Sequence, residues 1–549
     1  MKRFRFPAKG KPARYLIAAA AAATATGLSL HAANSDVLTL PSDYLPKVSE
    51  KIHNEINGIV RTSRAIVTVC STVVDYKSSL RGIQVGSDEY REKLSEVHLR
   101  SANRFLKLCE TNKGFYVKAG QFITAMRLVP KEYSSTLSSL QDQVVPCPFE
   151  AIKAILTGNL GPDFLEMFFS IDEQPIAAAS IAQVHHAVLK DGHEVAIKVQ
   201  YPGIEQQMYF DTRTMSFLAK AVAWFFPQCR FEWLVSVFAE AISLELDFVQ
   251  EARNSERAAK NFRNNKWVRV PLVFWELTTR QVLTMQFYRG HKIDDLDYLN
   301  QLGVDPLEVV EGLIELFAEM IFVHGYIHGD PHPGNILVSP EGSSGFSLVL
   351  LDHGVYKELD EQMRKNYCQL WKALVLNDSM KIINLGEKFG VGMYSRYFPV
   401  IFTGRTIESK HPVGVQAPFE EKRKLKEELK SISMEDVSSF MESLPPEFVS
   451  ILRVDGLLRY IIRKLGASSW PRLLAYTKYA VYGLSPKLDI ESGFSAEAVV
   501  YRLKSELEYL NIRTRIVIGA LIKGALYLLE KAKTASHSLY RSVVSLGIS

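Results

Sequence analysis

The chain has 549 residues, 47% hydrophobic and 23% charged, a composition that is ordinary for a globular protein of two to four structural units. Its net charge of +5 is concentrated at the N-terminus, so the nearly neutral body gives no indication of nucleic-acid binding. The five cysteines are odd in number, far apart and without a CxxC pair, which argues against a disulfide framework and against a structural zinc site.

The first 35 residues are basic and contain no acid. Their positive charges are Lys2, Arg3, Arg5, Lys9, Lys11 and Arg14, and the Ala-rich run YLIAAAAAATATGLSLHAA follows at 15–33. A negative-inside membrane potential attracts such a segment, so we predict organelle targeting for 1–35, to a mitochondrion or alternatively to a plastid. Two other interpretations are open. The run could be a retained membrane anchor, or a secretory signal, which the scattered thiols disfavour.

Residues 36–175 are predicted to form a mostly helical extension. Long amphipathic patterns such as SDEYREKLSEVHLRSANRFLKLCE are interrupted by glycines and by the break at Pro146–Pro148. From 176 to 290 the pattern indicates a mixed lobe. IAAASIAQVHHAVL and HEVAIKVQ are predicted strands joined by a turn at Asp191–Gly192. A long helical region follows at 205–264, and strand character returns at 268–287.

A second lobe is predicted at 291–400. A helix at 305–325 leads into the loop GYIHGDPHPGN, after which NILVS and SLVLLD are predicted to form a hairpin. Residues 401–549 are predicted to be a helical C-terminal region, in which the charged run 420–431 is a solvated helix face. The apolar run 512–533 is broken by Lys523 and is too short to span a membrane. It fits either an amphipathic surface helix or a helix packed on the second lobe.

Four polar residues follow one another in an order that indicates phosphate chemistry. Lys198 lies in the strand VAIK, Asp330 and Asn335 lie in the glycine- and proline-rich loop, and Asp352 follows the strand LVLL. This is the order of parts in a protein-kinase-like fold. A strand lysine supplies the cation that ATP phosphates need, and Mg²⁺ prefers oxygen ligands such as those of Asn335 and Asp352. Asp330 would accept or orient the proton of the attacking nucleophile.

Taken singly, each of these features is ordinary. VAIK is a common strand with an exposed lysine, Asp-x4-Asn is frequent turn chemistry, and DHG is an ordinary cap between a strand and a turn. Their joint order makes coincidence improbable, and it includes a hinge-like strand that ends at Met285 and Phe287. The pattern therefore predicts a nucleotide–metal site that binds ATP or ADP with Mg²⁺.

Several longer motifs are shared with one family. FYVKAGQ (115–121) contains a KxGQ signature, AAASIAQVH (177–185) is an Ala-rich loop, and LELDFVQEARN (244–254) carries an ExD pair. With HGDPHPGN and LLDHG, these motifs resemble the UbiB/aarF-domain (ABC1/ADCK) atypical kinases over roughly residues 90–400, most closely the aarF-domain-containing kinase 1 branch. The resemblance implies an α+β, bilobal protein-kinase-like fold with a helical N-terminal extension and a helical C-terminal region.

The resemblance also implies roles for individual residues. Glu251 would be the carboxylate that pairs with Lys198, and Lys118 of the KxGQ helix would lie near Glu245 and cover the nucleotide. The implied nucleotide-binding set is Ala177, Ala178, Ala179, Ser180, Lys198, Met285, Phe287, Lys118, Gln121, Glu245 and Asp247, and the catalytic set is Asp330, Lys198 and Glu251. Helix geometry supports one part of this assignment, because Asp247 and Glu251 are four residues apart and share a helix face.

The chain departs from ordinary protein kinases in its phosphate loop and its catalytic loop. Ala177–Ala179 and Ala182 stand where those kinases have glycine, and because alanine resists positive φ the loop should hold phosphates less closely. Gly329 precedes Asp330 in place of an arginine that could receive an activation-loop phosphate. His332 stands where many protein-serine kinases carry a phosphate-contacting lysine, and we expect it to pack or hydrogen-bond within the loop.

The segment after Asp352 is short. A helix is predicted to begin within about ten residues, and there is no APE motif, which leaves little room for a loop that presents a peptide. HGDPHPGN is also similar to the corresponding loop of small-molecule kinases such as aminoglycoside phosphotransferases. We therefore predict a small or lipid-like acceptor in preference to a protein.

Three hypotheses of function follow. The first is an atypical kinase or ATPase that depends on Mg·ATP and acts in mitochondrial lipid or isoprenoid-quinone homeostasis at an organelle membrane surface, as the resemblance implies. The second is a pseudokinase scaffold that binds nucleotide without turning it over. The third is a soluble small-molecule kinase with no membrane role. The intact set of Asp330, Asn335 and Asp352 favours an enzyme, since a pseudokinase need not keep an aspartate that orients a nucleophile.

Overall fold

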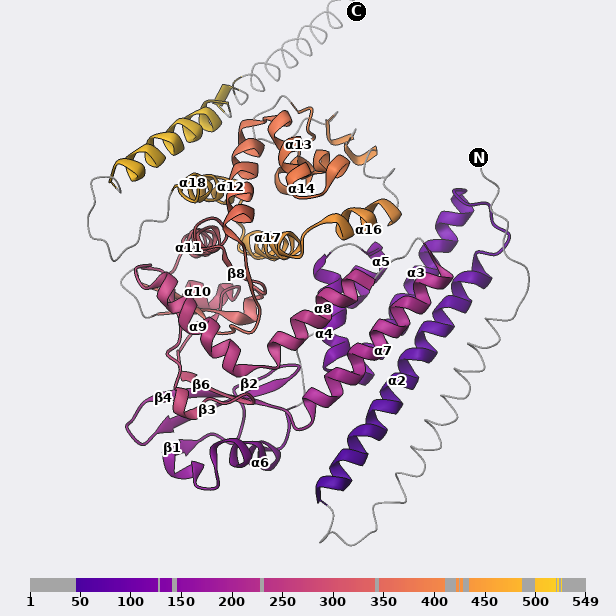
Figure 1. Cartoon of the computed structure of the whole chain (residues 1–549), viewed down its shortest axis with the longest axis vertical. Coiled ribbons are helices and arrows are strands. Elements are labelled where there is room, and N and C mark those ends of the chain that lie inside the picture. Colours follow the sequence, from indigo (N-terminus) through magenta and orange to yellow (C-terminus); the bar gives the residue numbers. More distant parts are fainter. Residues whose placement is uncertain are drawn as a thin grey trace, which may run out of the picture. The chain divides into compact units, whose positions relative to one another are not determined.

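The computed structural model describes residues 46–519 apart from 127–128, 141–145, 228–231, 341–344, 410–420, 424, 428–433 and 486–498, and it also describes 521–522 and 525. The predicted targeting segment 1–35 and much of the charged run 420–431 lie outside the described residues. The chain divides into two compact units, whose elements Figure 1 labels. Unit 1 contains the residues up to Lys260, Val270–Tyr288 and Asp352–Val355. Unit 2 contains Asn261–Arg269, Arg289–Leu351 and the residues from Tyr356 onward.

Unit 1 contains a five-stranded antiparallel sheet with the order β1-β3-β4-β6, in which β2 pairs with β3 beside this path. The strands are β1 (Phe168–Ile171), β2 (Ala177–Ala178), β3 (Ala182–Leu189), β4 (Glu194–Gln200) and β6 (Val282–Gln286). The predicted hairpin is present, because β3 and β4 meet at Asp191–Gly192, where Gly192 has a φ of +87°. β1 lies within the range predicted to be mostly helical.

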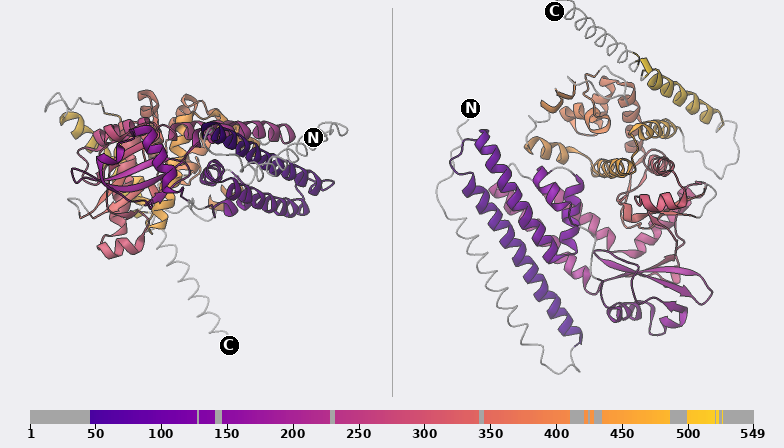
Figure 2. Two further views of the ribbon diagram at one scale, coloured as in Figure 1. Left: turned by 90° about the horizontal axis from the view of Figure 1, so that it is seen from below. Right: turned by 180° about the vertical axis from the view of Figure 1, so that it is seen from behind.

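The helices of unit 1 come largely from the N-terminal extension. They are α2 (Pro46–Ser79), α3 (Asp88–Asn112), α4 (Phe115–Met126), α5 (Lys131–Leu137), α6 (Phe149–Leu160), α7 (Ile204–Phe225), α8 (Glu232–Glu245) and α9 (Phe248–Phe262), whose last two residues belong to unit 2. The long helix α2 packs against α3 and α7, which run beside it in Figure 1 and in both views of Figure 2.

The helical region predicted at 205–264 is three helices, α7, α8 and α9, and the break between the last two lies at Leu246 and Asp247. The carboxylate of Asp247 accepts the N–H groups of Val249 and Gln250, both at 3.1 Å. It thereby caps the start of α9 and satisfies donors that a helix leaves open at its first turn. The cap fixes where α9 begins and so determines which of its residues face the sheet.

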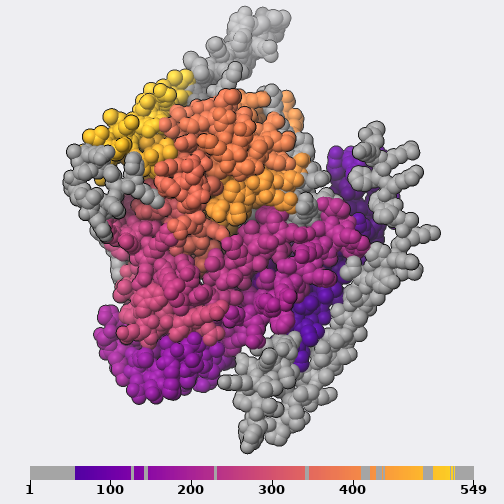
Figure 3. Space-filling view, in the orientation of Figure 1, coloured from indigo at the N-terminus to yellow at the C-terminus, as the bar shows by residue number. Residues whose placement is uncertain are grey.

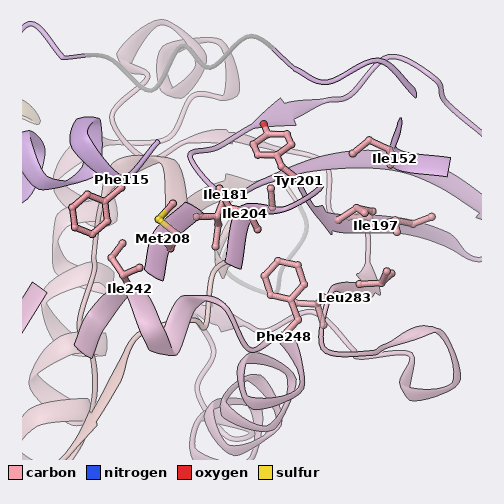
Figure 4. Close-up of a cluster of buried hydrophobic side chains, with 14 of the residues drawn as sticks. Phe115, Ile152, Ile181, Ile197, Tyr201, Ile204, Met208, Ile242, Phe248 and Leu283 are labelled. Carbon is pink, nitrogen blue, oxygen red and sulfur yellow. The ribbon is translucent and has the colours of Figure 1, made fainter. Parts of the chain in front are cut away.

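One hydrophobic core joins the sheet of unit 1 to the helical extension. Figure 4 shows Ile197 of β4 and Leu283 of β6 close to Phe248 of α9, with Phe115 of α4 and Ile242 of α8 in the same cluster. Each of these side chains is at most 2% exposed. Because the extension and the sheet share their apolar contacts, the KxGQ helix α4 is part of the same packed unit as the strand that carries Lys198.

Unit 2 contains a four-stranded sheet with the order β5-β10-β9-β7 and a two-stranded sheet of β8 and β11. The strands are β5 (Val268–Arg269), β7 (His291–Lys292), β8 (Tyr326–His328), β9 (Ile336–Ser339), β10 (Ser347–Leu350) and β11 (Tyr356–Glu358). The hairpin predicted after the loop is confirmed, since β9 and β10 pair antiparallel from Ser339 with Ser347 to Ile336 with Leu350. The loop therefore lies between two small sheets.

Helices make up the rest of unit 2. They are α10 (Leu296–Leu302), α11 (Pro306–Ala318), α12 (Glu361–Leu376), α13 (Ser379–Lys388), α14 (Phe398–Thr403), α16 (Met434–Ser443), α17 (Pro446–Lys464) and α18 (Trp470–Tyr482). A π-helical turn, η4 (Glu319–His324), continues α11. The helices α12 to α17 form much of the orange surface in Figure 3. Phe322, Trp371 and Tyr476 lie at their centre, all fully buried, with ring centroids 5.0 to 6.2 Å apart.

The C-terminal apolar run is partly described. Residues 499–519 are helical, and Glu506 of this helix accepts a hydrogen bond from the Tyr482 hydroxyl of α18. In the described part of the run 512–533, Ile512 and Ile516 are buried whereas Ile518, Leu521 and Ile522 are exposed, so both predicted alternatives stay open. Every helix in the described part of the chain is too short or too polar to cross a lipid bilayer.

Candidate functional site

Lys198 is held by a buried carboxylate in the middle of unit 1. Its neighbours along β4, Ile197 and Val199, point into the core, so the alternation of the strand places Lys198 on the other face. Its Nζ lies 2.7 and 2.9 Å from the two oxygens of Glu251 on α9 and 5.0 Å from the ring centroid of Phe248. The side chains of Lys198 and Glu251 are 12% and 1% exposed, so this is a buried, bidentate ion pair.

Asp352 approaches the same ammonium from the DHG turn. Its Oδ1 lies 3.6 Å from Nζ of Lys198 and accepts the N–H of Gly354 at 2.9 Å. A Cβ at Gly354 would lie 3.2 Å from this oxygen and 3.5 Å from Cγ of Glu245, so a larger residue would crowd the carboxylate. The carbonyl of His353 accepts a hydrogen bond from Asn254 at 2.9 Å, which ties the turn to α9.

The electrostatics of this cluster keep Lys198 charged. Burial would lower the pKa of Lys198, but the carboxylates of Asp352 and Glu251 outweigh burial and raise the pKa above its usual range. Burial also raises the pKa of Glu251 to about 7, while the ammonium of Lys198 acts in the opposite direction. The arrangement thus holds a fixed positive charge beside Asp352, whose side chain is 33% exposed and can reach a ligand.

The KxGQ motif contacts the end of α8, the helix that precedes α9 in the chain. Lys118 of α4 forms an ion pair with Glu245 at the end of α8. Gln121 donates to the carbonyl of Leu140 at 3.4 Å. A Cβ at Gly120 would lie 2.4 Å from Cδ1 of Leu140, so a larger residue here would require this leucine side chain to move. The structure therefore brings Lys118 and Glu245 together, while Gln121 faces the segment after α5.

The Ala-rich loop forms a tight turn between β2 and β3. Ala177 and Ala178 pair with β3, and the N–H of Ala179 donates to the carbonyl of Ala182 at 2.8 Å. The Oγ of Ser180 is buried without a hydrogen-bond partner within the described residues. A buried orphan hydroxyl in this loop is compatible with a polar ligand.

The predicted hinge residues lie at the end of β6. Met285 pairs with Ala196 of β4, and the N–H of Phe287 donates to the carbonyl of Glu194 at 3.0 Å. Phe287 also contacts the ring of His186 with centroids 4.7 Å apart. The backbone of the hinge is thus bound to the sheet that carries Lys198, and the N–H of Phe287 is already engaged in that sheet.

Asp330 and Asn335 belong to one loop in unit 2. The side-chain Nδ2 of Asn335 donates to the carbonyl of Asp330 at 3.0 Å, so its amide oxygen is the end that a cation could use. The N–H of Leu351 donates to the carbonyl of Asn335 at 2.9 Å, and Asp352 is the next residue in the chain. His332 accepts the N–H of Gly334 at its Nδ1, 3.1 Å away, in line with the loop role predicted for it.

Two contacts of the site were not predicted. Arg453 of α17 donates to Oδ1 of Asp330 at 3.1 Å, although 123 positions separate the two residues. No motif surrounds Arg453, so sequence reasoning had no signal for it. Asn254, which binds the DHG turn, lies three residues after Glu251 on the same helix face. The spacing of α9 could have indicated it.

The donor set fits a hard cation with few protein ligands. The described residues hold no cluster of three or more His, Cys, Asp or Glu side chains that could bind a metal. A carboxylate from Asp352 and an amide oxygen from Asn335 are the ligand types that Mg²⁺ takes when substrate oxygens and water complete its shell. Each of the two side chains, Asp352 in unit 1 and Asn335 in unit 2, is thus of a chemical type that suits Mg²⁺.

A separate apolar pocket of about 470 Å³ lies between α2 and α7 in unit 1. Its lining includes Ile66, Val73 and Phe217 and contains none of the predicted site residues. The charged cluster around Lys198 is therefore the better candidate for phosphate chemistry.

Comparison with known proteins identifies the family of the chain. Residues 139–386 match the ABC1 atypical kinase-like domain. AarF domain-containing protein kinase 1 of Xenopus laevis is 38% identical over 421 residues, which cover 75% of this chain and 80% of that protein. The protein of the same name from Mus musculus is 38% identical over 417 residues, with 75% and 79% covered.

One solved structure, the Rv3197–erythromycin complex from Mycobacterium tuberculosis, is 23% identical, with a TM-score of 0.40, and covers 69% of this chain and 98% of that one. The match to the ABC1 domain and the identity to the AarF domain-containing relatives confirm the predicted α+β kinase-like fold and the predicted family. The chain belongs to the AarF domain-containing kinase family, and residues 139–386 are its ABC1 atypical kinase-like domain.

Proposed function

We propose that the chain binds ATP with Mg²⁺ and either transfers or hydrolyses the terminal phosphoryl group. The observation that carries the proposal is the cluster of Lys198, Glu251 and Asp352, in which a buried ammonium is fixed by one carboxylate and lies next to another. A cation fixed in this way is preorganised for phosphate oxygens and needs no rearrangement when they arrive.

Each residue has a definite task in this proposal. Lys198 binds the phosphates, and Glu251 holds it in place by its two hydrogen bonds. Asp352 and Asn335 bind Mg²⁺, which when present neutralises the charge of the phosphate chain. Asp330 accepts or orients the proton of the attacking group.

The acceptor that fits is small or lipid-like. The chain passes from Asp352 to β11 at Tyr356 and to α12 at Glu361, so it has no long segment on which a peptide substrate could lie. The predicted placement in mitochondrial lipid or isoprenoid-quinone homeostasis, at an organelle membrane surface, rests on the family resemblance and on the basic, acid-free segment 1–35. Import of a fusion of residues 1–35 to a reporter into isolated mitochondria and plastids tests this placement.

A substitution at Asp352 tests the proposal. We expect Asp352→Asn to reduce the Mg²⁺-dependent gain in ATP and ADP affinity by at least about tenfold, because even an outer partner of a metal site is worth that much. Isothermal titration with and without Mg²⁺ measures the affinity, and phosphate release measures turnover. Asp88→Asn is the matched control, since Asp88 lies on α3 with its side chain 98% exposed.

The possible outcomes separate the hypotheses. Equal Mg²⁺-dependent affinities for the wild type and Asp352→Asn would contradict the metal role of Asp352. Nucleotide binding without turnover, even with membranes and candidate lipids present, would instead favour the pseudokinase scaffold. Turnover of a soluble small molecule by protein that lacks residues 1–35 and does not float with liposomes would favour the small-molecule kinase.

A further inference from the structure

The backbone of the loop around Asp330 is fixed by the loop itself. The N–H of Asp330 donates to Nδ1 of the buried His328 at 3.0 Å. Its carbonyl accepts the N–H of His332 at 2.7 Å and the side-chain amide of Asn335 at 3.0 Å. These bonds set the position of the main chain, but they do not set the rotation of the Asp330 carboxylate, which is the group that meets the acceptor.

Arg453 supplies that missing restraint. Its Nη2 lies 3.1 Å from Oδ1 of Asp330, and the two side chains are 16% and 25% exposed. A guanidinium withdrawn from water to this extent depends on a charged partner to offset its lost hydration. The contact therefore holds one carboxylate oxygen in a set direction and leaves the second oxygen for another group.

The loop contains no Lys or Arg of its own between Gly325 and Asn335. His332, two positions after Asp330, uses its Nδ1 to accept the N–H of Gly334 and so takes part in the internal bonding of the loop. The cationic group that the structure places against the Asp330 carboxylate comes from a helix much later in the chain.

The helix α17, which carries Arg453, is held in place by other contacts within unit 2. Its Asp455 binds Arg459 at 2.5 Å and Arg472 of α18 at 2.6 Å, and both guanidinium groups also donate to the carbonyl of Phe402. These contacts tie α17 to its neighbours within unit 2. Arg453 differs from the other two arginines because its carboxylate partner lies in the candidate catalytic loop.

We propose that Arg453 is a positioning residue for the reaction: it orients the carboxylate of Asp330 so that the second oxygen faces the attacking group. The inference rests on the proposed function, because it concerns the same phosphoryl transfer. It also extends the reacting machinery beyond residue 386, where the match to the ABC1 domain ends, into the C-terminal helical region. The helices after the domain would then be required for turnover but not for nucleotide binding.

The test compares the wild type with Arg453→Ala, Arg453→Lys and Arg463→Ala in the full chain. Arg463 is an exposed residue of the same helix and serves as the matched control. Phosphate release from Mg·ATP, with water as acceptor, gives kcat and KM. Each variant is also assayed with added guanidinium at low millimolar concentration, and its thermal midpoint is recorded.

We expect Arg453→Ala to lower kcat by about 10- to 100-fold, the loss typical of a misplaced catalytic group, with KM for ATP within about threefold of the wild type. Arg453→Lys and added guanidinium should each restore part of the lost kcat, because they return a cation to the site. Arg463→Ala should match the wild type. A purely structural ion pair would not respond to guanidinium at a concentration that leaves the thermal midpoint unchanged.

Three results would overturn the inference. Unchanged kcat in Arg453→Ala would show that the contact does not serve the reaction. Increased kcat would show that the contact with Arg453 holds the Asp330 carboxylate in an unproductive orientation. A loss of kcat that follows a lower thermal midpoint, without rescue by lysine or guanidinium, would mark the pair as structural. A different result, a wild type that neither releases phosphate nor transfers it to candidate lipids, would remove the proposed function and this inference with it.

Discussion

Each unit contains one ion pair formed by predicted site residues or their partners, and the two pairs are built in different ways. Lys198 and Glu251 in unit 1 are almost fully buried, come from adjacent elements of one core and make two short hydrogen bonds. Arg453 and Asp330 in unit 2 are partly exposed, come from segments 123 positions apart and make one contact. The first pair is part of the packing of its unit, whereas the second adjusts a side chain on a loop that is otherwise complete.

The difference shows how a fold can separate binding from reaction. Under the proposed function, the cation that would bind the phosphates is set into the core of unit 1 beside its carboxylate partner. The carboxylate that would meet the acceptor is 25% exposed and contacts a helix that follows the ABC1 domain. We expect the two pairs to differ in their contribution to stability, and we expect the first pair to respond to pH and to depend on the cap of the helix that carries Glu251.

The largest effect is expected from removing one partner of the buried pair. Glu251→Ala leaves the Lys198 ammonium buried without its bidentate carboxylate and should cost about 3–5 kcal/mol of stability. Asp330→Ala should cost about 1 kcal/mol, because the Asp330 carboxylate is 25% exposed and makes a single contact with Arg453. The midpoint of urea unfolding measures both. A combined Lys198→Met and Glu251→Leu variant is the control and should recover most of the loss. Equal losses of stability in Glu251→Ala and Asp330→Ala would contradict the expected difference between the two ion pairs.

A smaller effect is expected from pH. Because burial raises the pKa of Glu251 to about 7, this carboxyl takes up a proton as the pH falls below 7, and Lys198 then loses a charged partner. A carboxyl group with a pKa of about 7 is only about one-tenth ionised at pH 6. We therefore expect the affinity for Mg-nucleotide to fall by up to about tenfold between pH 8 and pH 6. Glu251→Gln, titrated in parallel, corrects for protonation of the nucleotide itself. A wild-type profile parallel to that of Glu251→Gln would contradict the assignment.

The smallest effect concerns Asp247, which the family resemblance placed in the nucleotide set. Since its carboxylate caps α9, Asp247→Ala should destabilise unit 1 by about 1 kcal/mol, and Asp247→Asn, which keeps a capping oxygen, should be close to the wild type. Thermal unfolding and nucleotide titration of both variants distinguish the two roles. Loss of nucleotide affinity in the stable Asn variant would show that the negative charge itself serves the ligand.

Local patterns predicted much of the fold. The apolar–polar alternation around VAIK and the turn dipeptide Asp191–Gly192 predicted the hairpin of β3 and β4. The apolar runs after the loop GYIHGDPHPGN predicted the hairpin of β9 and β10. The break between α8 and α9 was missed because amphipathic spacing continues through it, and only the capping geometry of Asp247 interrupts the helix. The short strand β1 was missed because four residues carry too little periodic signal.

The candidate site was predictable where its residues lie in motifs. The resemblance paired Lys198 with Glu251 and Lys118 with Glu245, and the structure places each pair in contact. Arg453 could not be predicted, because a contact across 123 positions depends on how α17 packs and leaves no periodic or compositional trace in the sequence. Sequence reasoning therefore recognised residues that bind through local motifs and missed one that acts through tertiary packing.

The short segment between the DHG turn and α12 limits how the activity of the protein could be regulated. Between Asp352 and Asp360 the chain contains no serine or threonine, and its one tyrosine, Tyr356, is buried in the pairing of β11 with β8. This stretch offers no hydroxyl that a modifying enzyme could reach, and its strand is already fixed. The rate of turnover would then depend on the concentrations of nucleotide and acceptor and would not be controlled by covalent modification of a hydroxyl in this stretch.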